Sequence, residues 1–256
     1  MARAFMNIAH RGFSGRYPEN TLIAFRAAFD LGCEWVECDV RRTADGVFVV
    51  LHDAAVDRTT DGDGRIDAMT SDQVRRLDAG SWRAPEFRGE RVPLLTELLD
   101  LVGGDRTGRR AVIELKFPSV HLGGIVDLIR ARDAFGWTDV SAFEWETILA
   151  VRRLARDWRA TWLVRLDGMS AAEAIERCRG AGVAILGPHA ARVDRALVEA
   201  AHEAGLLVRA WGLGDDRGPE LRRLIGLGVD GMTTNHPDAL MAILAAQTAR
   251  AESKGP

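Results

Sequence analysis

Short aliphatic runs alternate along the chain with amphipathic helical patterns. In the second half, helical patterns end at Gly182, Gly205 and Gly228, and an aliphatic run follows each glycine directly. Glycine just beyond a helix end adopts the left-handed conformation that closes the helix, so the next strand can begin at once. Strands that are aliphatic throughout are typical of parallel sheets covered on both faces. The pattern therefore predicts repeated strand–helix units.

The starts of several helices carry matching signals. Ser170 with Glu173, and Thr70 with Gln73, have the residue types and the spacing of a capping box. Pro219 occupies a place where a proline fits the first turn of a helix, because the missing N–H would have no partner there. These signals support helices between the aliphatic runs.

Nine segments have the length and composition of strands. They are residues 7–11, 35–42, 47–52, 111–116, 138–143, 161–166, 183–187, 206–211 and 229–234. A parallel crossover needs about a dozen residues or more, but only residues 43–46 separate the second segment from the third. Asp45 and Gly46 are instead typical of a tight hairpin. We therefore predict that 47–52 returns antiparallel to 35–42, which leaves the eight parallel strands of an α/β TIM (β/α)₈ barrel.

Residues 53–108 contain no candidate barrel strand. They combine a polar, turn-rich stretch with two helical patterns. Connections of this length inside a compact fold are commonly functional. We expect a single (β/α)₈ barrel domain over residues 1–256, with a small insertion at 53–108 after the second barrel strand and its hairpin.

Composition and charge exclude several classes of protein. The 256 residues include 34 Lys+Arg and 37 Asp+Glu, a net charge of −3 without a basic run, which argues against a nucleic-acid partner. No apolar run approaches the roughly 20 residues that span a bilayer, so we expect no stable membrane insertion. Cys33, Cys38 and Cys178 form no paired motif. They indicate neither a disulfide framework nor a thiolate zinc site and favour a reducing, cytoplasmic location.

The lysine content is unusually low. All but two of the 34 basic residues are arginines, and the two lysines are Lys116 and Lys254. Codon bias would replace surface lysines by arginine throughout the chain. Because Lys116 persists in an aliphatic segment, we expect it to have a specific role, whereas Lys254 lies in a terminal tail.

Candidate catalytic side chains gather where the early strands end, which is where barrel enzymes place their active sites. They are His10 and Arg11 after the first strand, Glu37 and Asp39 on the second, His52 at the end of the return strand, and Glu114 and Lys116 on the next barrel strand. Residues two apart share one face of a strand. A hairpin turn centred on residues 44–45 would also place His52 opposite Glu37. We therefore predict that these seven side chains converge at one barrel mouth.

Three carboxylates facing one cavity would repel one another without a cation. Taken singly, a histidine at a strand end is commonly a loop contact, and Glu37 and Asp39 could be solvated at a sheet edge. Charged groups are rarely buried, however, unless they are paired or bind a metal. A hard divalent ion with oxygen ligands, Mg²⁺ or Ca²⁺, would remove the repulsion. The residues do not offer the thiolates or several histidines that favour zinc.

Six motifs occur in order over the first 116 residues: His10–Gly12, Pro18–Thr21, Glu37–Val40, Thr43–Gly46, Val49–Asp53 and Ile113–Lys116. Weaker ones follow: Ser141–Phe143, Trp211, Gly228–Gly231 and Thr234–Pro237. Together they resemble the signature of the glycerophosphodiester phosphodiesterases. The resemblance implies a metal-dependent hydrolase that converts small glycerophosphodiesters to sn-glycerol 3-phosphate and an alcohol.

The resemblance also implies roles for individual residues. Glu37, Asp39 and Glu114 would hold the divalent metal, His10 and His52 would act as general acid and base, and Arg11 and Lys116 would contact the phosphate. Trp211, Phe143 and Glu19 are further candidates for substrate binding. Glu19 could instead orient Arg11, and Asn20 or Thr21 is expected to cap the helix that starts at Leu22.

Several alternatives stay open at this point. The same chemistry could act on lysophospholipids or sphingomyelin, with Trp82 and Phe87 of the insertion forming an apolar surface. A barrel that binds glycerophosphates without turnover is a third reading. Either water or the glycerol hydroxyl of the substrate could attack phosphorus, and either histidine could be the acid. The chain departs from the family pattern after Trp211 and at Asn235, where the family often has Asp, and both departures concern substrate preference.

Overall fold

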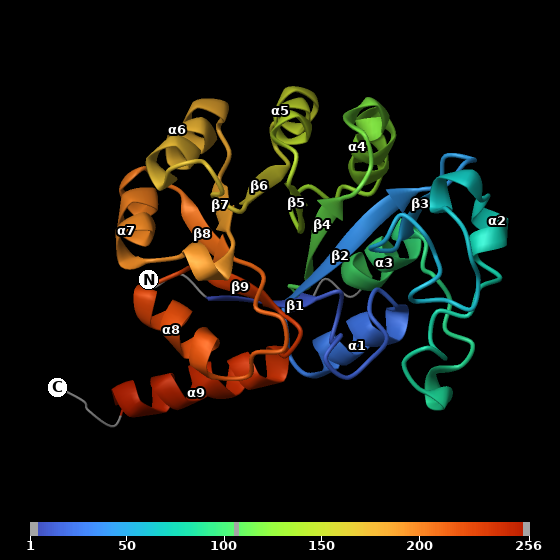
Figure 1. Cartoon of the computed structure of the whole chain (residues 1–256), viewed down its shortest axis with the longest axis horizontal. Coiled ribbons are helices and arrows are strands. Elements are labelled where there is room, and N and C mark those ends of the chain that lie inside the picture. Colours follow the sequence, from blue (N-terminus) through green and yellow to red (C-terminus); the bar gives the residue numbers. More distant parts are fainter. Residues whose placement is uncertain (1–4, 105–107, 253–256) are drawn as a thin grey trace.

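The computed structural model describes residues 5–104 and 108–252, so Lys254 lies outside the described residues (Figure 1). In that part of the chain the sheet has nine strands, of which eight are parallel and close on themselves through the pairing of β1 with β2. The parallel strands are β1 (Met6–His10), β2 (Trp35–Arg42), β4 (Arg110–Leu115), β5 (Thr138–Ala142), β6 (Arg159–Val164), β7 (Ile185–Pro188), β8 (Leu207–Ala210) and β9 (Gly231–Thr234). The predicted TIM barrel is confirmed.

Helices follow the strands and surround the barrel (Figure 1). They are α1 (Leu22–Asp30), α2 (Ser71–Val74), α3 (Leu95–Gly103), α4 (Leu122–Ala131), α5 (Trp145–Leu154), α6 (Ala171–Ala181), α7 (Arg195–Glu203), α8 (Pro219–Leu227) and α9 (Pro237–Glu252), with the short 3₁₀ turns η1 (Ile66–Ala68), η2 (Pro85–Phe87), η3 (Ser119–His121) and η4 (Ala190–Arg192). Capping boxes open α2 at Thr70 and α6 at Ser170, as predicted. Gly182 and Gly228 close α6 and α8 with φ of 67° and 89°.

None of the described helices combines the length and the apolar character that crossing a bilayer requires.

The predicted return strand is present, but its register differs from the prediction by one residue. β3 (Phe48–Val50) pairs antiparallel with β2, and Val50 lies opposite Val40, so position 52 falls opposite position 38 and not opposite Glu37. The reason is a three-residue turn over residues 44–46, closed by hydrogen bonds between Thr43 and Val47. Gly46 has φ of 88°, the left-handed conformation that ends such a turn. The prediction that the register places His52 beside Glu37 is therefore wrong.

The segment predicted as an insertion, 53–108, contains two kinds of packing. Its first part surrounds a small apolar cluster formed by Val49, Leu51, Val56, Ile66, Val74, Ala79 and Val92. Helix α3 instead buries Leu95 and Leu98 in the main core, as the other barrel helices do. Neighbouring β3 residues enter both clusters, Val49 the small one and Val50 the main one. We propose on this ground that the chain is one domain.

A buried ion cluster lies among the strands below the C-terminal ends. Arg159 makes two hydrogen bonds of 2.8 Å to Asp139, and one amino group of Arg209 lies 3.4 Å from the same carboxylate. The side chain of Arg209 is only 2% exposed, and burial lowers its pKa to about 10. Asp139 is therefore the counter-charge that allows an arginine to remain in the barrel interior.

Asp139→Asn should destabilise the fold, because it leaves Arg209 buried without a carboxylate. We expect the free energy of unfolding, measured in urea, to fall by about 3 kcal/mol. Asp167→Asn is the matched control, since Asp167 pairs with Arg192 in solvent and should contribute less than about 1 kcal/mol. Equal effects of the two substitutions would contradict this account of the barrel interior.

Candidate active site

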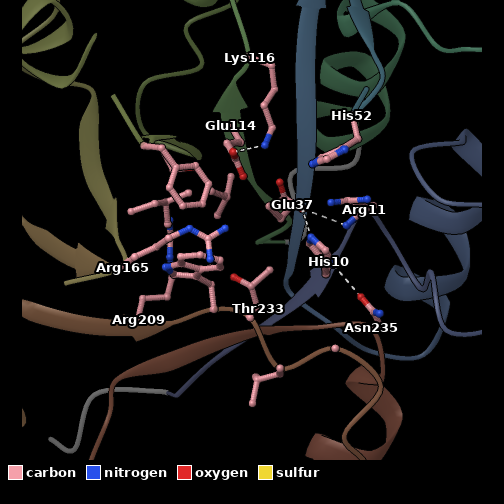
Figure 2. A pocket seen from close by; sticks show the side chains of 18 residues that line it. His10, Arg11, Glu37, His52, Glu114, Lys116, Arg165, Arg209, Thr233 and Asn235 are labelled. Carbon is pink, nitrogen blue, oxygen red and sulfur yellow. Dashed lines mark hydrogen bonds and ion pairs between the residues drawn. The ribbon is translucent and has the colours of Figure 1, made fainter. Parts of the chain in front are cut away.

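The C-terminal ends of β1, β2 and β4 bring the predicted catalytic residues around one cavity of about 480 Å³. The parallel register places His10 beside Glu37 and Asp39 beside Glu114. Predicted site residues that line the cavity are His10, Arg11, Glu37, His52, Glu114, Lys116, Phe143 and Trp211. Figure 2 shows His10, Arg11 and His52 on one side of the cavity, with Glu37 and Glu114 in its wall.

Glu37, Asp39 and Glu114 form a buried cluster in which one oxygen atom of each lies within 4.8 Å of the others. Glu37 also has a buried oxygen with no hydrogen-bond partner in the described structure, and the corresponding oxygens of Asp39 and Glu114 face Lys116 Nζ. Burial and the nearby charge of Asp39 raise the pKa of Glu37 to about 8 and that of Glu114 to about 7. Buried carboxylate oxygens at this spacing fit a divalent cation with oxygen ligands.

Two cationic side chains contact the cluster. Arg11 Nε lies 3.0 Å and Lys116 Nζ 3.4 Å from oxygen atoms of Asp39, and Lys116 also pairs with Glu114. These two cations outweigh burial and hold the pKa of Asp39 below its usual value. Arg11 adopts a left-handed backbone conformation with φ of 56°, and its N–H donates to Glu37 Oε2 at 3.0 Å. The side chain of Arg11 therefore contacts Asp39, while its backbone N–H contacts Glu37.

His10 is held by the amide of Asn235, so the departure from the family pattern at this position reaches a histidine of the proposed acid/base pair, and the expectation that it concerns substrate preference alone is wrong. Its Nδ1 lies 2.6 Å from Asn235 Oδ1, while Asn235 Nδ2 donates to Asp215, which fixes the orientation of the amide. His10 therefore donates from Nδ1 and presents an unprotonated Nε2, which lies 3.9 Å from Glu37 Oε2. Burial, followed by the charge of Arg11, lowers the pKa of His10. This environment favours the neutral imidazole.

His52 is held by a carboxylate. Its Nδ1 lies 2.6 Å from Asp53 Oδ1, on the next residue of the chain, so its partner is Asp53 and not the predicted Glu37. Burial, together with the charges of Arg11 and Lys116, lowers the pKa of His52, and the charge of Asp39 and the hydrogen bond to Asp53 oppose this shift only in part. A carboxylate stabilises the protonated imidazole more than an amide does. The two histidines therefore have different chemical environments.

The loop between β1 and α1 supports the carboxylates from outside the cavity. Glu19 does not line the cavity and instead accepts a hydrogen bond of 2.7 Å from Arg11. This contact agrees with the alternative prediction, that Glu19 orients Arg11, and not with substrate binding by Glu19. Thr21 caps α1, whereas Asn20 donates to Asp39 Oδ2 at 2.9 Å and is itself buried. Asn20 has φ of 58°, a left-handed conformation that asparagine tolerates well. The motif Pro18–Thr21 thus has a second role, the contact with Asp39, which its capping pattern does not predict.

Aromatic residues line the opposite side of the cavity. The Trp211 indole N–H donates to the Gly187 carbonyl at 2.9 Å, and Phe143 packs edge-on against Trp211 with ring centroids 4.8 Å apart. The Arg165 guanidinium lies 4.9 Å from the Trp211 ring centroid, across the cavity from Arg11 and His52 in Figure 2. Sequence reasoning did not find Arg165, because it follows β6 without a recognisable motif.

Comparison with known proteins agrees with this geometry. The family model described as "Glycerophosphoryl diester phosphodiesterase family" matches residues 10–239. The chain belongs to this family. A glycerophosphodiester phosphodiesterase of Caldanaerobacter subterraneus is 33% identical to it, over 93% of this chain and 96% of the relative.

Solved structures of glycerophosphodiester phosphodiesterases share the same barrel. A putative family member from Silicibacter pomeroyi superposes with a TM-score of 0.86 at 27% identity, covering 96% of this chain and 95% of that one. An Oleispira antarctica phosphodiesterase in complex with the product sn-glycerol-3-phosphate superposes with a TM-score of 0.84 at 28% identity, covering 96% and 97%. This family member is therefore an enzyme with the fold of the family.

Binding of Mg²⁺ or Ca²⁺ to the metal-free phosphodiesterase should release protons. With pKa values of about 8 and about 7, Glu37 and Glu114 are largely protonated at about pH 6 and must lose those protons to act as ligands. A pH-indicator dye in weak buffer measures the release, and Glu37→Gln should release fewer protons. Metal binding by the wild type without proton release would contradict the raised pKa values.

The same raised pKa values predict how metal-free stability depends on pH. In the folded state Glu37 keeps its proton from about pH 4.5 to about pH 8, while the unfolded chain has already lost it. The contribution of Glu37 and Glu114 to stability is therefore lost as the pH rises through this range. Thermal melting in a chelator should show that added metal stabilises the protein more at the upper end of the range than at the lower end.

Proposed function

We propose that the chain hydrolyses glycerophosphodiesters to sn-glycerol 3-phosphate and an alcohol. The observation that carries the proposal is the convergence of two imidazoles, two cations and the carboxylates of Glu37 and Glu114 on one cavity of about 480 Å³, with the carboxylate of Asp39 buried beside them. A phosphodiester is a small anion whose negative charge grows on phosphoryl oxygens in the transition state, so it requires positive groups, which Arg11, Lys116 and a metal ion held by the carboxylates would supply. The glycerol phosphate held by the Oleispira relative supports a substrate of this class.

The three buried carboxylates support a metal requirement. Glu37, Asp39 and Glu114 would hold the ion, and their hard oxygen donors favour Mg²⁺ or Ca²⁺. Such an ion would supply positive charge to a phosphoryl oxygen of the substrate. Arg11 and Lys116, which already contact Asp39, would donate hydrogen bonds to the remaining phosphoryl oxygens.

The different partners of the histidines support a division of labour. His10, kept neutral by Asn235, would accept the proton from the attacking hydroxyl, whether from water or from the glycerol moiety. His52, whose protonated form is stabilised by Asp53, would donate a proton to the alkoxide that leaves. Arg11 lies between the two rings in Figure 2. It can therefore bind the phosphate group, with the attacking hydroxyl near one histidine and the leaving alkoxide near the other.

Contacts of the insertion favour a small substrate over a lipid. Phe87 packs against Tyr17 with ring centroids 5.6 Å apart, and Trp82 donates its N–H to the Ala79 carbonyl. Large hydrophobic side chains that are exposed within the described ranges are Trp82, Val120 and Leu154, which belong to separate segments. A charged guanidinium, that of Arg165, also lines the cavity. These features do not form the apolar surface that a lysophospholipid or sphingomyelin would need at the barrel mouth.

The direct test is product formation. Purified protein with glycerophosphocholine or glycerophosphoethanolamine and Mg²⁺ or Ca²⁺ should release sn-glycerol 3-phosphate, detected by an enzyme-coupled assay. His10→Ala should lower kcat about 10²- to 10⁴-fold, because the attacking hydroxyl loses its proton acceptor. Absence of product above the His10→Ala background with either metal and both substrates would overturn the proposed function.

The proposed roles of the two histidines predict different dependence on the leaving group. A p-nitrophenyl ester of glycerol phosphate leaves as a stable anion and needs no proton from the enzyme. The fold-loss of activity caused by His52→Ala should therefore be at least about tenfold smaller on this ester than on glycerophosphocholine. His10→Ala should lose similar activity on both substrates. The reverse pattern would show that the acid and base roles are exchanged.

A further inference from the structure

Arg58 lies between the two loops that carry the proposed catalytic and phosphate-binding residues. It belongs to the segment that follows β3. Its Nε donates to Asp53 Oδ2 at 2.5 Å, and its two amino groups donate to the two carboxylate oxygens of Glu19 at 2.8 and 3.0 Å. The contact between Arg58 and Glu19 therefore joins residues 39 positions apart in the chain.

Each carboxylate that Arg58 contacts also holds a residue of the site. Asp53 uses its other oxygen to hold His52 Nδ1 at 2.6 Å. Glu19 accepts a hydrogen bond of 2.7 Å from Arg11, which in turn contacts Asp39. A continuous series of charged hydrogen bonds thus runs from His52 through Arg58 to Arg11 and the carboxylate cluster.

The electrostatic effects of Arg58 agree with these contacts. Partial burial raises the pKa of Asp53, but hydrogen bonds from Arg58 and His52 outweigh it and lower the pKa to about 2. Burial likewise raises the pKa of Glu19, and hydrogen bonds and charge from Arg58 and Arg11 reverse the shift. Both carboxylates therefore stay ionised. The planar fork of arginine suits two carboxylates at once, which the single ammonium of lysine does not.

We propose that Arg58 is a positioning residue, which fixes His52 and Arg11 relative to each other. It does not line the cavity, so it acts through Asp53 and Glu19 and not on the substrate. The Arg58 side chain is 45% exposed, and ion pairs that reach solvent contribute little to stability. Loss of Arg58 therefore lowers catalysis far more than it lowers stability. The inference rests on the proposed phosphodiesterase activity.

The first experiment compares Arg58→Gln with Arg65→Gln. Arg65 is the matched control, because it lies in the same segment and pairs with exposed Asp67 through two hydrogen bonds without contacting the site. Arg58→Gln should lower kcat/KM on glycerophosphocholine about 10- to 100-fold. Loss of a residue that holds a metal ligand in place by a hydrogen bond has an effect of this size in other enzymes. Its melting temperature should stay close to that of Arg65→Gln, and the control should keep wild-type activity.

The second experiment separates positioning from a general structural effect. Guanidinium ions should restore part of the activity of Arg58→Ala, while sodium ions at equal ionic strength should not, and Arg65→Ala should not respond. Arg58→Lys, which keeps the charge but lacks the fork, should retain activity between those of the wild type and Arg58→Gln. Combining Arg58→Gln with Asp53→Asn should cost less than the product of the two separate losses, because both break the same connection to His52.

Two failures are distinguishable. An active wild type with Arg58→Gln as active as Arg65→Gln overturns the positioning role and leaves the proposed function intact. Strictly multiplicative losses in the double variant, or equal effects of guanidinium and sodium, also overturn the positioning role. A wild type that releases no sn-glycerol 3-phosphate overturns the proposed function itself.

Discussion

The repulsion among three buried carboxylates is the constraint on which the site depends. Oxygen atoms of Glu37, Asp39 and Glu114 lie within 4.8 Å of one another, and each residue is at least nine-tenths buried. The surrounding groups reduce this repulsion in steps. Arg11 and Lys116 add positive charge, and protonation of two carboxylates removes negative charge. A divalent ion would replace those protons and add further positive charge. Binding of an anionic phosphodiester thus becomes favourable where a bare acidic cluster would repel it.

The barrel supplies the positions and its connections supply the orientation. Parallel pairing of β1, β2 and β4 fixes which side chains stand side by side, because register in a closed sheet leaves little freedom. The loop between β1 and α1 adopts conformations that regular strands lack, with positive φ at Arg11 and Asn20. The segment after β3 then provides Asp53 and Arg58, and Arg58 links this segment to the β1–α1 loop through Glu19. Rigid strands therefore hold the proposed metal ligands, while hydrogen bonds between loops position the proposed proton-transfer and phosphate-binding groups.

The sequence predicts the parts of this arrangement that follow from periodicity and local signals. Strand order and capping boxes follow from local patterns. The acidic cluster follows from local patterns together with one assumption, that the C-terminal ends of neighbouring barrel strands lie close together. Register across the hairpin depended on a turn one residue longer than expected. The contacts of Asn235 with His10 and of Arg58 with Glu19 join residues far apart in the chain. No periodic pattern encodes such contacts, so they required the structure.

The most direct measurement is the anomalous difference density of crystals grown with Ca²⁺. The account predicts one strong peak bounded by Glu37, Asp39 and Glu114, with carboxylate oxygens of all three at about 2.3 to 2.6 Å from the ion. It also predicts that the peak disappears in Asp39→Asn crystals. A fully calcium-loaded crystal with no peak there, or with the ion held by other residues, would contradict the claim that this carboxylate cluster is a metal site.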